Sequence, residues 1–491
     1  MFKKSDLKNS IWLAFQYIVL IGLSFLGLKL NLMSLGERQF GVWVLLLSFF
    51  GFGSALDFGM GMSIVRWMSS KDTYSSLQTI ATNALFSMLV SGIFVASSIL
   101  LFVIKFVALN TKFVAPEDVS LIIRVSFLLV LSFYINYAII FFRSVFEGLN
   151  NFAWVAKLSI LNSITQFLCI LLVFLLNLGI FGLVIFIVLN SFIQLVIHWY
   201  LFSSSQTSIT IKLNSLSFRT AKSLFSQSLT LQGANLLGAA LDPIIKYTIG
   251  IYANPSSIST FEIAKRFVQA FSGIYNNSLR NILPMVSALN SKEQHRSFLF
   301  STAVPISRVS VYFSIICFSA LSPAFLIANT MFFNLHSIIV PFLICILIES
   351  TNIFGSVYYG FLIGLKQERF LAILQLMNVI FVSCFLRLGY TLSGSSLGLL
   401  GYYLSVLFGS MPILFMTGRI AKISFATLWL KSGWIRLFFF HFLLLINIYL
   451  VLKYPEFQLK IQIVGLLIAV ITSINRDSIN LTKRILELVK V

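Results

Sequence analysis

Charged side chains are scarce in this sequence. Only 10% of its 491 residues are Asp, Glu, Lys or Arg, and just 15 residues are acidic. A soluble chain of this length would form several domains with charged surfaces, yet no polar stretch here is long enough to make one. The hydrophobic fraction of 58% and the mean hydropathy of +0.95 predict instead a chain that lies almost wholly within a membrane.

Cysteine and catalytic motifs are sparse as well. The four cysteines, none of them in a CxxC pair, all lie inside apolar stretches: Cys169, Cys317, Cys345 and Cys384. We therefore expect neither a disulfide nor a metal site. HExxH, GxSxG, DxD and Walker patterns are missing from the sequence, so we expect no catalytic residues, no energy-coupling ATPase and no bound cofactor.

Apolar stretches fill nearly all of the chain. Because a bilayer core about 30 Å thick needs roughly 20 apolar residues per helix, the sequence predicts about 14 membrane spans, with a count of about 12 as the alternative. The spans cover residues 11–33, 40–65, 79–104, 119–142, 153–176, 180–202, 224–250, 257–285, 299–328, 337–363, 370–392, 396–418, 434–452 and 460–475. The predicted fold class is an all-α polytopic membrane protein.

Basic residues gather in every second gap between these spans. With the N-terminus in the cytoplasm, 22 of the 35 Lys and Arg residues fall in cytoplasmic segments. Only five fall outside: Arg38, Lys105, Lys112, Lys453 and Lys460. This bias predicts that both termini are cytoplasmic. It also explains the net charge of +20 without a nucleic-acid partner, because no basic domain exists outside the membrane.

The two halves of the chain echo each other at a constant offset. The segment FEGLNNFAWVAKLSILN, from Phe146, matches LIGLKQERFLAILQLMN, from Leu362. Pairs 216 positions apart are Gly148 with Gly364, Leu149 with Leu365, Ala156 with Ala372, Leu158 with Leu374, Asn162 with Asn378, and Gly182 with Gly398. Chance matching between Leu-rich segments is the alternative. An even number of spans separates the copies, so the repeat is parallel and suits alternating access at a site between two lobes.

The repeat divides the chain into four parts. We expect an N-terminal six-helix lobe over residues 1–205, a cytoplasmic linker over 206–223 and a pseudo-symmetric six-helix lobe over 224–419. The remaining residues, 420–491, hold the last two spans and a cytoplasmic tail, and these two helices should pack peripherally.

Several charged residues lie inside predicted spans. Such a side chain costs about 2.5–3.5 kcal/mol on insertion scales and usually faces a cavity or a partner. Asp242 and Lys246 are four residues apart in the seventh span and share a helix face, while Pro243 removes a backbone donor beside them. The two charges either neutralise each other during insertion or belong to a functional site.

The eighth span is unusually polar. Glu262, Arg266, Gly273, Asn277 and Arg280 recur at steps of three, four and seven residues, so they form one stripe along a helix. A stripe of this kind lines water or substrate, or it forms a structural network with another helix.

Three more charges lie deep within spans. Arg308 stands about three turns from the cytoplasmic face, where it either snorkels or enters a cavity. Asp57 and Glu349 are mid-membrane carboxylates, each either a hydrogen-bonded structural acid or a proton or ion site. His198 and His441 stand alone near predicted span ends, where interfacial positions are expected.

The stretch LGERQFGVWVLLLSFFGFGSALDFGMGMSIVR, from Leu35 to Arg66, resembles the early signature of Wzx-type polysaccharide flippases. These belong to the multidrug/oligosaccharidyl-lipid/polysaccharide exporter superfamily. The matching residues are Leu35-Gly36, Phe40-Gly41, Asp57, Gly59, Gly61 and Arg66. The seventh span with Asp242 and the eighth, which opens on Phe261-Glu262 and ends at Pro284, are also similar to this family.

The resemblance implies a flippase of the bacterial inner membrane. It would move undecaprenyl-pyrophosphate-linked oligosaccharide, such as an O-antigen unit, from the cytoplasmic to the outer leaflet, with a polysaccharide polymerase as a partner. A pyrophosphate head group needs a cationic cavity, and Arg offers it bidentate contacts. The candidate substrate-binding residues are Lys246, Arg266, Arg280 and Arg308.

Transport in one direction needs energy, and the sequence holds no nucleotide site. H⁺ or Na⁺ antiport through a buried carboxylate is therefore a hypothesis, because desolvation and nearby cations shift the protonation of such an acid in opposite directions. The candidate ion-coupling residues, in order, are Asp242, Glu262, Asp57 and Glu349.

Two other classes compete with a flippase. A cation-coupled exporter of drugs or other lipids would have a net acidic or apolar cavity, whereas the cavity inferred here is net basic. A polysaccharide polymerase, ligase or lipid-dependent glycosyltransferase usually carries a large external loop. The longest external gap here, residues 105–118, is short.

Reporter fusions test the predicted topology. We expect a cytoplasmic reporter fused after Val491, and an external reporter inserted after Asn110, to be active, because the basic bias places these points on opposite sides. Activity of an external reporter alone at Val491 would reverse the orientation.

Overall fold

A computed structural model describes the chain over residues 4–55, 61, 64–65, 74–110, 112–149, 151–204, 211, 216–217, 236–278, 286, 291–333, 335, 337–365, 367–393, 396–458, 460–462 and 464–465. Within these ranges the backbone forms helices joined by turns, without a strand. The chain divides into two compact units, Met1–Ser259 and Thr260–Val491.

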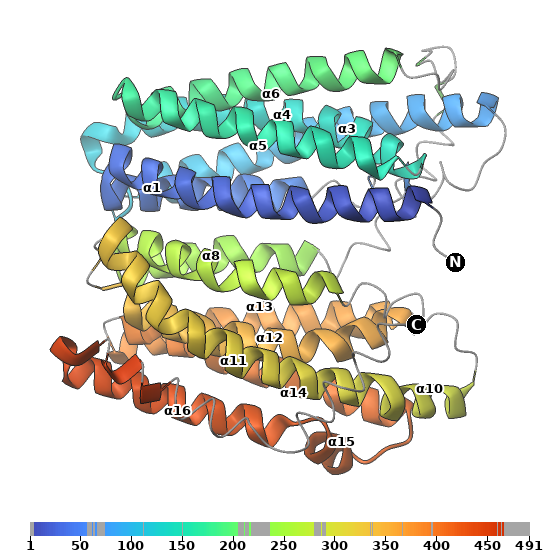
Figure 1. The fold of residues 1–491 in the computed structure, drawn as a ribbon. Helices are drawn as coiled ribbons and strands as arrows, with labels where there is room; N and C mark the ends of the chain where they lie inside the picture. Colours follow the sequence, from blue (N-terminus) through green and yellow to red (C-terminus); the bar gives the residue numbers. More distant parts are fainter. Residues whose placement is uncertain are drawn as a thin grey trace. The chain divides into compact units, whose positions relative to one another are not determined.

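Long apolar helices build the first unit (Figure 1). They are α1 (Lys4–Ala55), α3 (Tyr74–Val103) with its π-helical extension η1 (Ile104–Ala108), α4 (Val119–Gly148) after the short η2 (Pro116–Asp118), α5 (Phe152–Leu175) and α6 (Gly179–Ser204). A helix over residues 236–252 and the start of α8 (Pro255–Ser278) follow. α1 packs on α5, α3 on α4, and α6 on both α4 and α5, so α4, α5 and α6 form a three-helix group.

α1 contains the first predicted span and residues 40–55 of the second, and it bends between them. The bend lies at Gly36, whose φ of 71° and ψ of 168° are not helical. A positive φ of this size is easy for glycine and strained for other residues. The Leu35-Gly36 pair of the sequence signature therefore ends one span and begins the next.

Three predicted external gaps meet in the first unit. The Lys112 Nζ donates a hydrogen bond to the carbonyl of Ile251 at 3.1 Å, and the rings of Phe113 and Tyr247 stack at 5.4 Å between centroids. Gly41, just after the bend in α1, lies so close to the Pro255 carbonyl that a Cβ would overlap it. These gaps lie on one side in the predicted topology, and their contacts agree with it.

The second unit is built around α12. Its elements are the remainder of α8, α10 (Lys292–Phe298), η5 (Leu299–Ala303), α11 (Val304–Ala328), η6 (Asn329–Phe333), α12 (Ile339–Gly364), α13 (Glu368–Ser393), η7 (Ser396–Gly398), α14 (Leu399–Ile420), α15 (Phe425–Lys431), α16 (Trp434–Lys453) and η8 (Pro455–Phe457). All residues from Ile339 to Thr351 are buried. α12 contacts α11, α14 and α16, which makes it the central helix of this unit.

A buried histidine joins α16 to the unit. His441 is 2% exposed, and its ring nitrogens lie 2.8 Å from the Ser350 hydroxyl and 2.9 Å from the Tyr403 hydroxyl. Helix packing around α12 and α14 encloses His441, and its expected interfacial depth stays a prediction. Phe438 and Phe442 on the same helix are exposed, as expected of a helix with a lipid-facing side.

The repeat reappears in the backbone of both units. α4 ends at Gly148 and α12 at Gly364, and the following residues, Leu149 and Leu365, share φ −84° and ψ 9°. The amides at these positions bond the carbonyls four residues earlier at 3.0 and 3.1 Å. α6 and α14 also end 216 residues apart, at Ser204 and Ile420. The same turn therefore joins corresponding helices in the two units.

Ten helices in the described part of the chain are long and apolar enough to cross a membrane. They are Val19–Phe52, Gln78–Ala108, Val119–Gly148, Trp154–Leu175, Gly179–Ser204, Glu293–Met331, Ile339–Gly364, Arg369–Ser393, Leu399–Ile420 and Trp434–Lys453. The first of these overlaps two predicted spans. The protein is thus an all-α polytopic membrane protein, and its described helices are consistent with the predicted total of about 14 spans in two pseudo-symmetric lobes and two C-terminal helices.

The boundary between the compact units differs from the predicted lobe boundary. Packing divides the chain at Ser259 and Thr260, inside α8, whereas the sequence places a linker at residues 206–223. The physical reason is that residues 236–252 pack on the first unit, through contacts such as Lys112 with Ile251. Most of the linker lies outside the described residues, and the four-part division stays a prediction.

Substitution of Gly41 tests the contact with Pro255. We expect Gly41→Ala to destabilise the protein by about 1–3 kcal/mol, the usual cost of overpacking, because backbone must move to admit the methyl group. Thermal unfolding in detergent micelles measures the effect. Gly22→Ala is the control, since a Cβ there meets nothing within 4 Å. Equal melting temperatures for the two variants would contradict the contact.

Candidate functional site

The structure describes six of the eight predicted site residues. Asp57 and Arg280 lie outside the described residues. Asp242 and Lys246 belong to the first unit, and Glu262, Arg266, Arg308 and Glu349 belong to the second. Each group has its own surroundings.

Asp242 and Lys246 form the predicted pair along one helix. The Lys246 Nζ lies 2.7 Å from the Asp242 Oδ2, with the lysine side chain 5% exposed and the aspartate side chain 32% exposed. The helix continues through Pro243. The pair places a buried cation beside a more accessible acid, so the charge of Lys246 is balanced within its own helix.

Glu262 and Arg266 form a second pair of the same spacing. The Arg266 Nε lies 2.6 Å from the Glu262 Oε1. Here the acid is the buried partner, at 7% exposure, and the arginine side chain is 36% exposed. Part of the arginine side chain thus remains accessible while its acid is enclosed by packing.

Glu349 lies against the polar face of α8. The Gln269 Nε2 donates a hydrogen bond to the Glu349 Oε1 at 3.0 Å, and Lys265 and Ser272 lie near enough to act on the charge of Glu349. Glu349 is 8% exposed. This mid-membrane acid is not isolated: Gln269, Ser272 and Lys265, which stand beside the predicted stripe on α8, place amide, hydroxyl and ammonium groups near it.

Arg308 docks at a different place in the second unit. Its Nε donates a hydrogen bond to the carbonyl of Lys431, at the end of α15, at 2.6 Å. The neighbouring Ser307 bonds the hydroxyl of Tyr358 on α12 at 2.9 Å. Tyr358 is nine residues from Glu349, about 14 Å along the helix. The structure therefore separates Arg308 from the surroundings of Glu349 by more than two helical turns.

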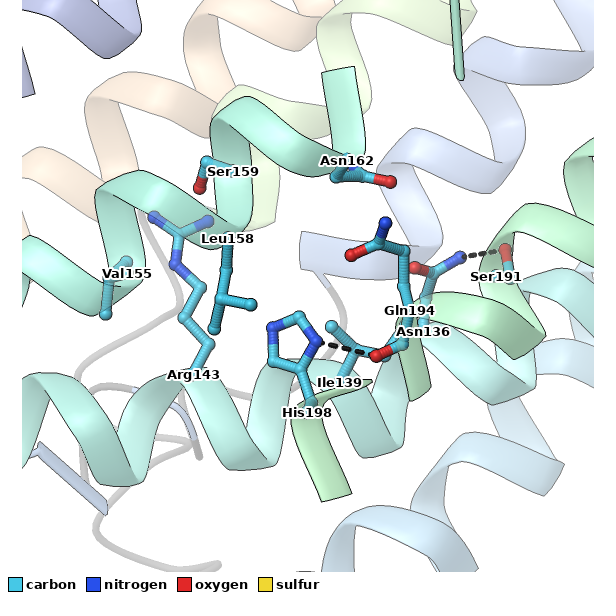
Figure 2. Close-up of a pocket in the computed structure, with 10 residues that line it drawn as sticks. All are labelled: Asn136, Ile139, Arg143, Val155, Leu158, Ser159, Asn162, Ser191, Gln194 and His198. Carbon is cyan, nitrogen blue, oxygen red and sulfur yellow. Dashed lines mark hydrogen bonds between the residues drawn. The ribbon is translucent and has the colours of Figure 1, made fainter. Parts of the chain in front are cut away.

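The first unit also contains a polar cavity that the sequence did not single out. It lies between α4, α5 and α6, has a volume of about 80 Å³, and is lined by Asn136, Arg143, Ser159, Asn162, Ser191, Gln194 and His198 together with aliphatic side chains. Figure 2 shows these side chains converging on one space. They come from helix faces on which polar residues recur about every four positions.

Hydrogen bonds join the walls of this cavity. The Ser132 and Ser191 hydroxyls lie 2.8 Å apart, and the Asn136 Nδ2 donates to the Ser191 Oγ at 3.3 Å (Figure 2). The Asn190 Nδ2 donates to the Asn162 Oδ1 at 2.9 Å. These bonds fix the relative rotation of the three helices inside the membrane.

His198 belongs to the same cavity. It is 5% exposed, and its Nδ1 lies 2.8 Å from the carbonyl of Gln194 (Figure 2). His198 is buried rather than exposed, because α4 and α5 cover this face of α6, and its interfacial depth stays a prediction. The sequence signal that could have found the cavity is the four-residue spacing of Asn190, Gln194 and His198, a polar stripe on an otherwise apolar helix.

Comparison with known proteins gives the family. The family model described as "Polysaccharide biosynthesis protein" matches residues 7–290. No curated protein matches the sequence.

Solved structures share the fold. An inward-facing multidrug resistance MATE transporter of the MOP superfamily is 16% identical, with a TM-score of 0.57 over 88% of this chain and 100% of its own. The lipid II flippase MurJ, in an inward closed conformation, is 14% identical, with a TM-score of 0.56 over 94% of this chain and 97% of its own. The Vibrio cholerae MATE transporter VcmN is 12% identical, with a TM-score of 0.56 over 87% and 100%.

These identities establish a common fold, while the family model covers more than half of the chain. Both agree with the resemblance carried by the Leu35–Arg66 signature. The chain belongs to the polysaccharide biosynthesis protein family and has the fold of the MOP-superfamily transporters.

Proposed function

We propose that this protein flips undecaprenyl-pyrophosphate-linked oligosaccharide units from the cytoplasmic to the outer leaflet of a bacterial inner membrane. The observation that carries the proposal is the family match over residues 7–290, joined to a fold shared with a lipid II flippase. Alternating access between the two repeated lobes supplies the route, and a polysaccharide polymerase would consume the product outside.

The anionic pyrophosphate would exchange with carboxylates on the protein. Lys246 is paired with Asp242 and Arg266 with Glu262. A phosphate and a carboxylate compete for the same guanidinium, since both accept bidentate hydrogen bonds. When Glu262 turns away or takes up a proton, Arg266 can bind the phosphate, so the cationic character of the cavity depends on the state of the acids.

The same competition would couple transport to an ion gradient. When Asp242 or Glu262 binds H⁺ or Na⁺, its ion pair with Lys246 or Arg266 breaks. The freed basic side chain can then bind the lipid head group, which links ion binding to substrate binding. Glu349 accepts a hydrogen bond from the neutral Gln269 amide, so it can take up a proton without breaking that contact. These three acids are the coupling candidates in the described part of the chain.

Transport by Arg266 variants tests the substrate assignment. Proteoliposomes would contain a fluorescent polyprenyl-pyrophosphate oligosaccharide, with its outer-leaflet fraction measured by an impermeant quencher. We expect Arg266→Ala to slow flipping by about 10- to 100-fold, equivalent to one charged contact of ~1.5–3 kcal/mol. Arg266→Lys should recover part of the rate, because the charge remains but the planar fork is lost.

Arg387→Ala is the matched control, since Arg387 is an exposed arginine of the same unit. Normal flipping by Arg266→Ala would remove this residue from the mechanism. If the wild type moves no lipid but exports cationic dyes against a proton gradient, the protein is a drug exporter and the proposal is wrong.

Neutral variants of the acids test ion coupling. We expect an imposed pH or Na⁺ gradient to accelerate flipping in the wild type, and Asp242→Asn to abolish that acceleration, because the amide binds neither ion as a carboxylate does. Glu262→Gln and Glu349→Gln rank the other acids, and Glu293→Gln, at an exposed residue of α10, is the control. A full response in Asp242→Asn excludes Asp242. A wild type insensitive to both gradients would point to removal of the product as the driving force.

A further inference from the structure

A buried acceptor in the α4–α6 cavity lacks a donor among the described residues. Gln194 lines the cavity, is 2% exposed, and its Oε1 accepts no hydrogen bond from them. Its Nε2 donates to the Thr165 Oγ1 at 3.2 Å, so the amide is held in place. The adjacent Asn190 also has an Oδ1 without a donor. Leaving such a group unsatisfied costs about 1–3 kcal/mol, so Gln194 needs a hydrogen-bond donor inside the cavity, which water in the empty state and a ligand in the bound state can supply.

The charges of the cavity favour a neutral ligand. Among its lining residues the one full charge is that of Arg143, which is already 2.9 Å from Glu147. An anion would face the unsatisfied oxygen of Gln194, and a cation would face Arg143 with no carboxylate in the lining. A hydroxyl group both donates and accepts hydrogen bonds, so it satisfies Gln194 without either conflict.

The shape of the cavity also suits a sugar. At roughly 10–15 Å³ per water-sized group, a volume of about 80 Å³ accepts several non-hydrogen atoms, which is the edge of one ring. Ile139 and Leu158 add apolar surface beside the polar groups, and carbohydrate rings present C–H faces as well as hydroxyls. Small-molecule sites are usually lined by apolar side chains with a few polar groups at defined positions.

The position of the cavity fits pick-up of substrate from the cytoplasm. Arg143 lies near the end of α4, at Gly148, and Val155 near the start of α5, at Phe152. This turn is a predicted cytoplasmic gap. Asn136 is 12 residues from the end of α4, about 18 Å along the helix. The cavity thus extends from the predicted cytoplasmic end toward the middle of the membrane.

The internal repeat allows the residues that line this cavity to be compared with their counterparts in the other unit. Positions 216 residues after Arg143, Gln194 and His198 are Tyr359, Ser410 and Leu414. The helix ends and the turn correspond in the two units, and the lining residues Asn136 and Asn162 recur as Asn352 and Asn378, but Arg143, Gln194 and His198 are each replaced by a different side chain. The helix arrangement of one unit therefore forms without the Gln194 amide and the His198 ring, so these two groups are available for a role other than maintaining the repeated fold.

From this geometry we infer that the α4–α6 cavity binds one sugar ring of the glycan head group through its hydroxyls, with Gln194 as a specificity-determining residue. The inference rests on the proposed function and deepens it. The charged residues would bind the pyrophosphate common to all such lipids, and this cavity would discriminate between sugars.

Binding measurements with sugar-bearing and sugar-free lipids test the inference. The probes are short-chain polyprenyl pyrophosphate and the same lipid carrying a single hexose or a single N-acetylhexosamine. Dissociation constants would be measured with the full-length protein in nanodiscs. We expect the wild type to bind at least one sugar-bearing lipid about five- to tenfold more tightly than the sugar-free lipid, the scale of one or two neutral hydrogen bonds.

Gln194→Met should remove that difference and leave the affinity for the sugar-free lipid unchanged, because it keeps the side-chain length and deletes the amide, both its free acceptor and its Nε2 donor to Thr165. Ser410→Ala, at the repeat-related position, is the control and should behave as the wild type. Ser159→Ala replaces a smaller lining group and provides the same comparison if Gln194→Met does not reach the membrane.

The outcomes distinguish this inference from the proposed function. If the wild type binds all lipids equally, or Gln194→Met keeps the sugar preference, the cavity does not read sugar and only the inference fails. If Gln194→Met instead loses binding of ²²Na⁺, the cavity is a cation site and the inference is overturned. If the wild type binds no polyprenyl pyrophosphate at all, the proposed function fails together with the inference.

Discussion

The bilayer core offers no hydrogen-bond partner, and the arrangement of polar side chains in this protein depends on that constraint. Lys246 is balanced by Asp242 one turn away, and Glu349 is bonded by Gln269 from another helix. His441 bonds two hydroxyls and thereby joins α16 to α12 and α14. Polar contacts of this kind select which faces of otherwise similar apolar helices meet.

The same constraint makes polar groups with exchangeable or missing partners candidates for a functional role. Under the proposed function, buried charges must leave their partners during the transport cycle, so the ion pair of Arg266 with Glu262 would be both a structural contact and a site of exchange. An amide oxygen without a donor, as at Gln194, has the opposite character. It is ready for a ligand without any rearrangement of charge, which suits recognition of neutral sugar rather than phosphate.

The repeated halves have kept one backbone and acquired different side chains. Leu149 and Leu365 end corresponding helices with the same dihedral angles. The polar face of α6, with Gln194 and His198, has no counterpart on α14, where Ser410 and Leu414 stand. A duplicated fold permits such differences, because the packing at the helix ends does not depend on the side chains that line a cavity.

The sequence by itself determined the helical class, the positions of most spans, the repeat offset and the two charged pairs. These features follow from hydropathy and from the four-residue geometry of a single helix, so local order suffices. Only the tertiary structure decided that Glu349 meets Gln269, 80 residues away, that Arg308 docks on Lys431, 123 residues away, and that Asn136, Gln194 and His198 enclose a cavity. Each of these depends on how helices are rotated against one another, and apolar helices of similar composition do not encode that rotation locally.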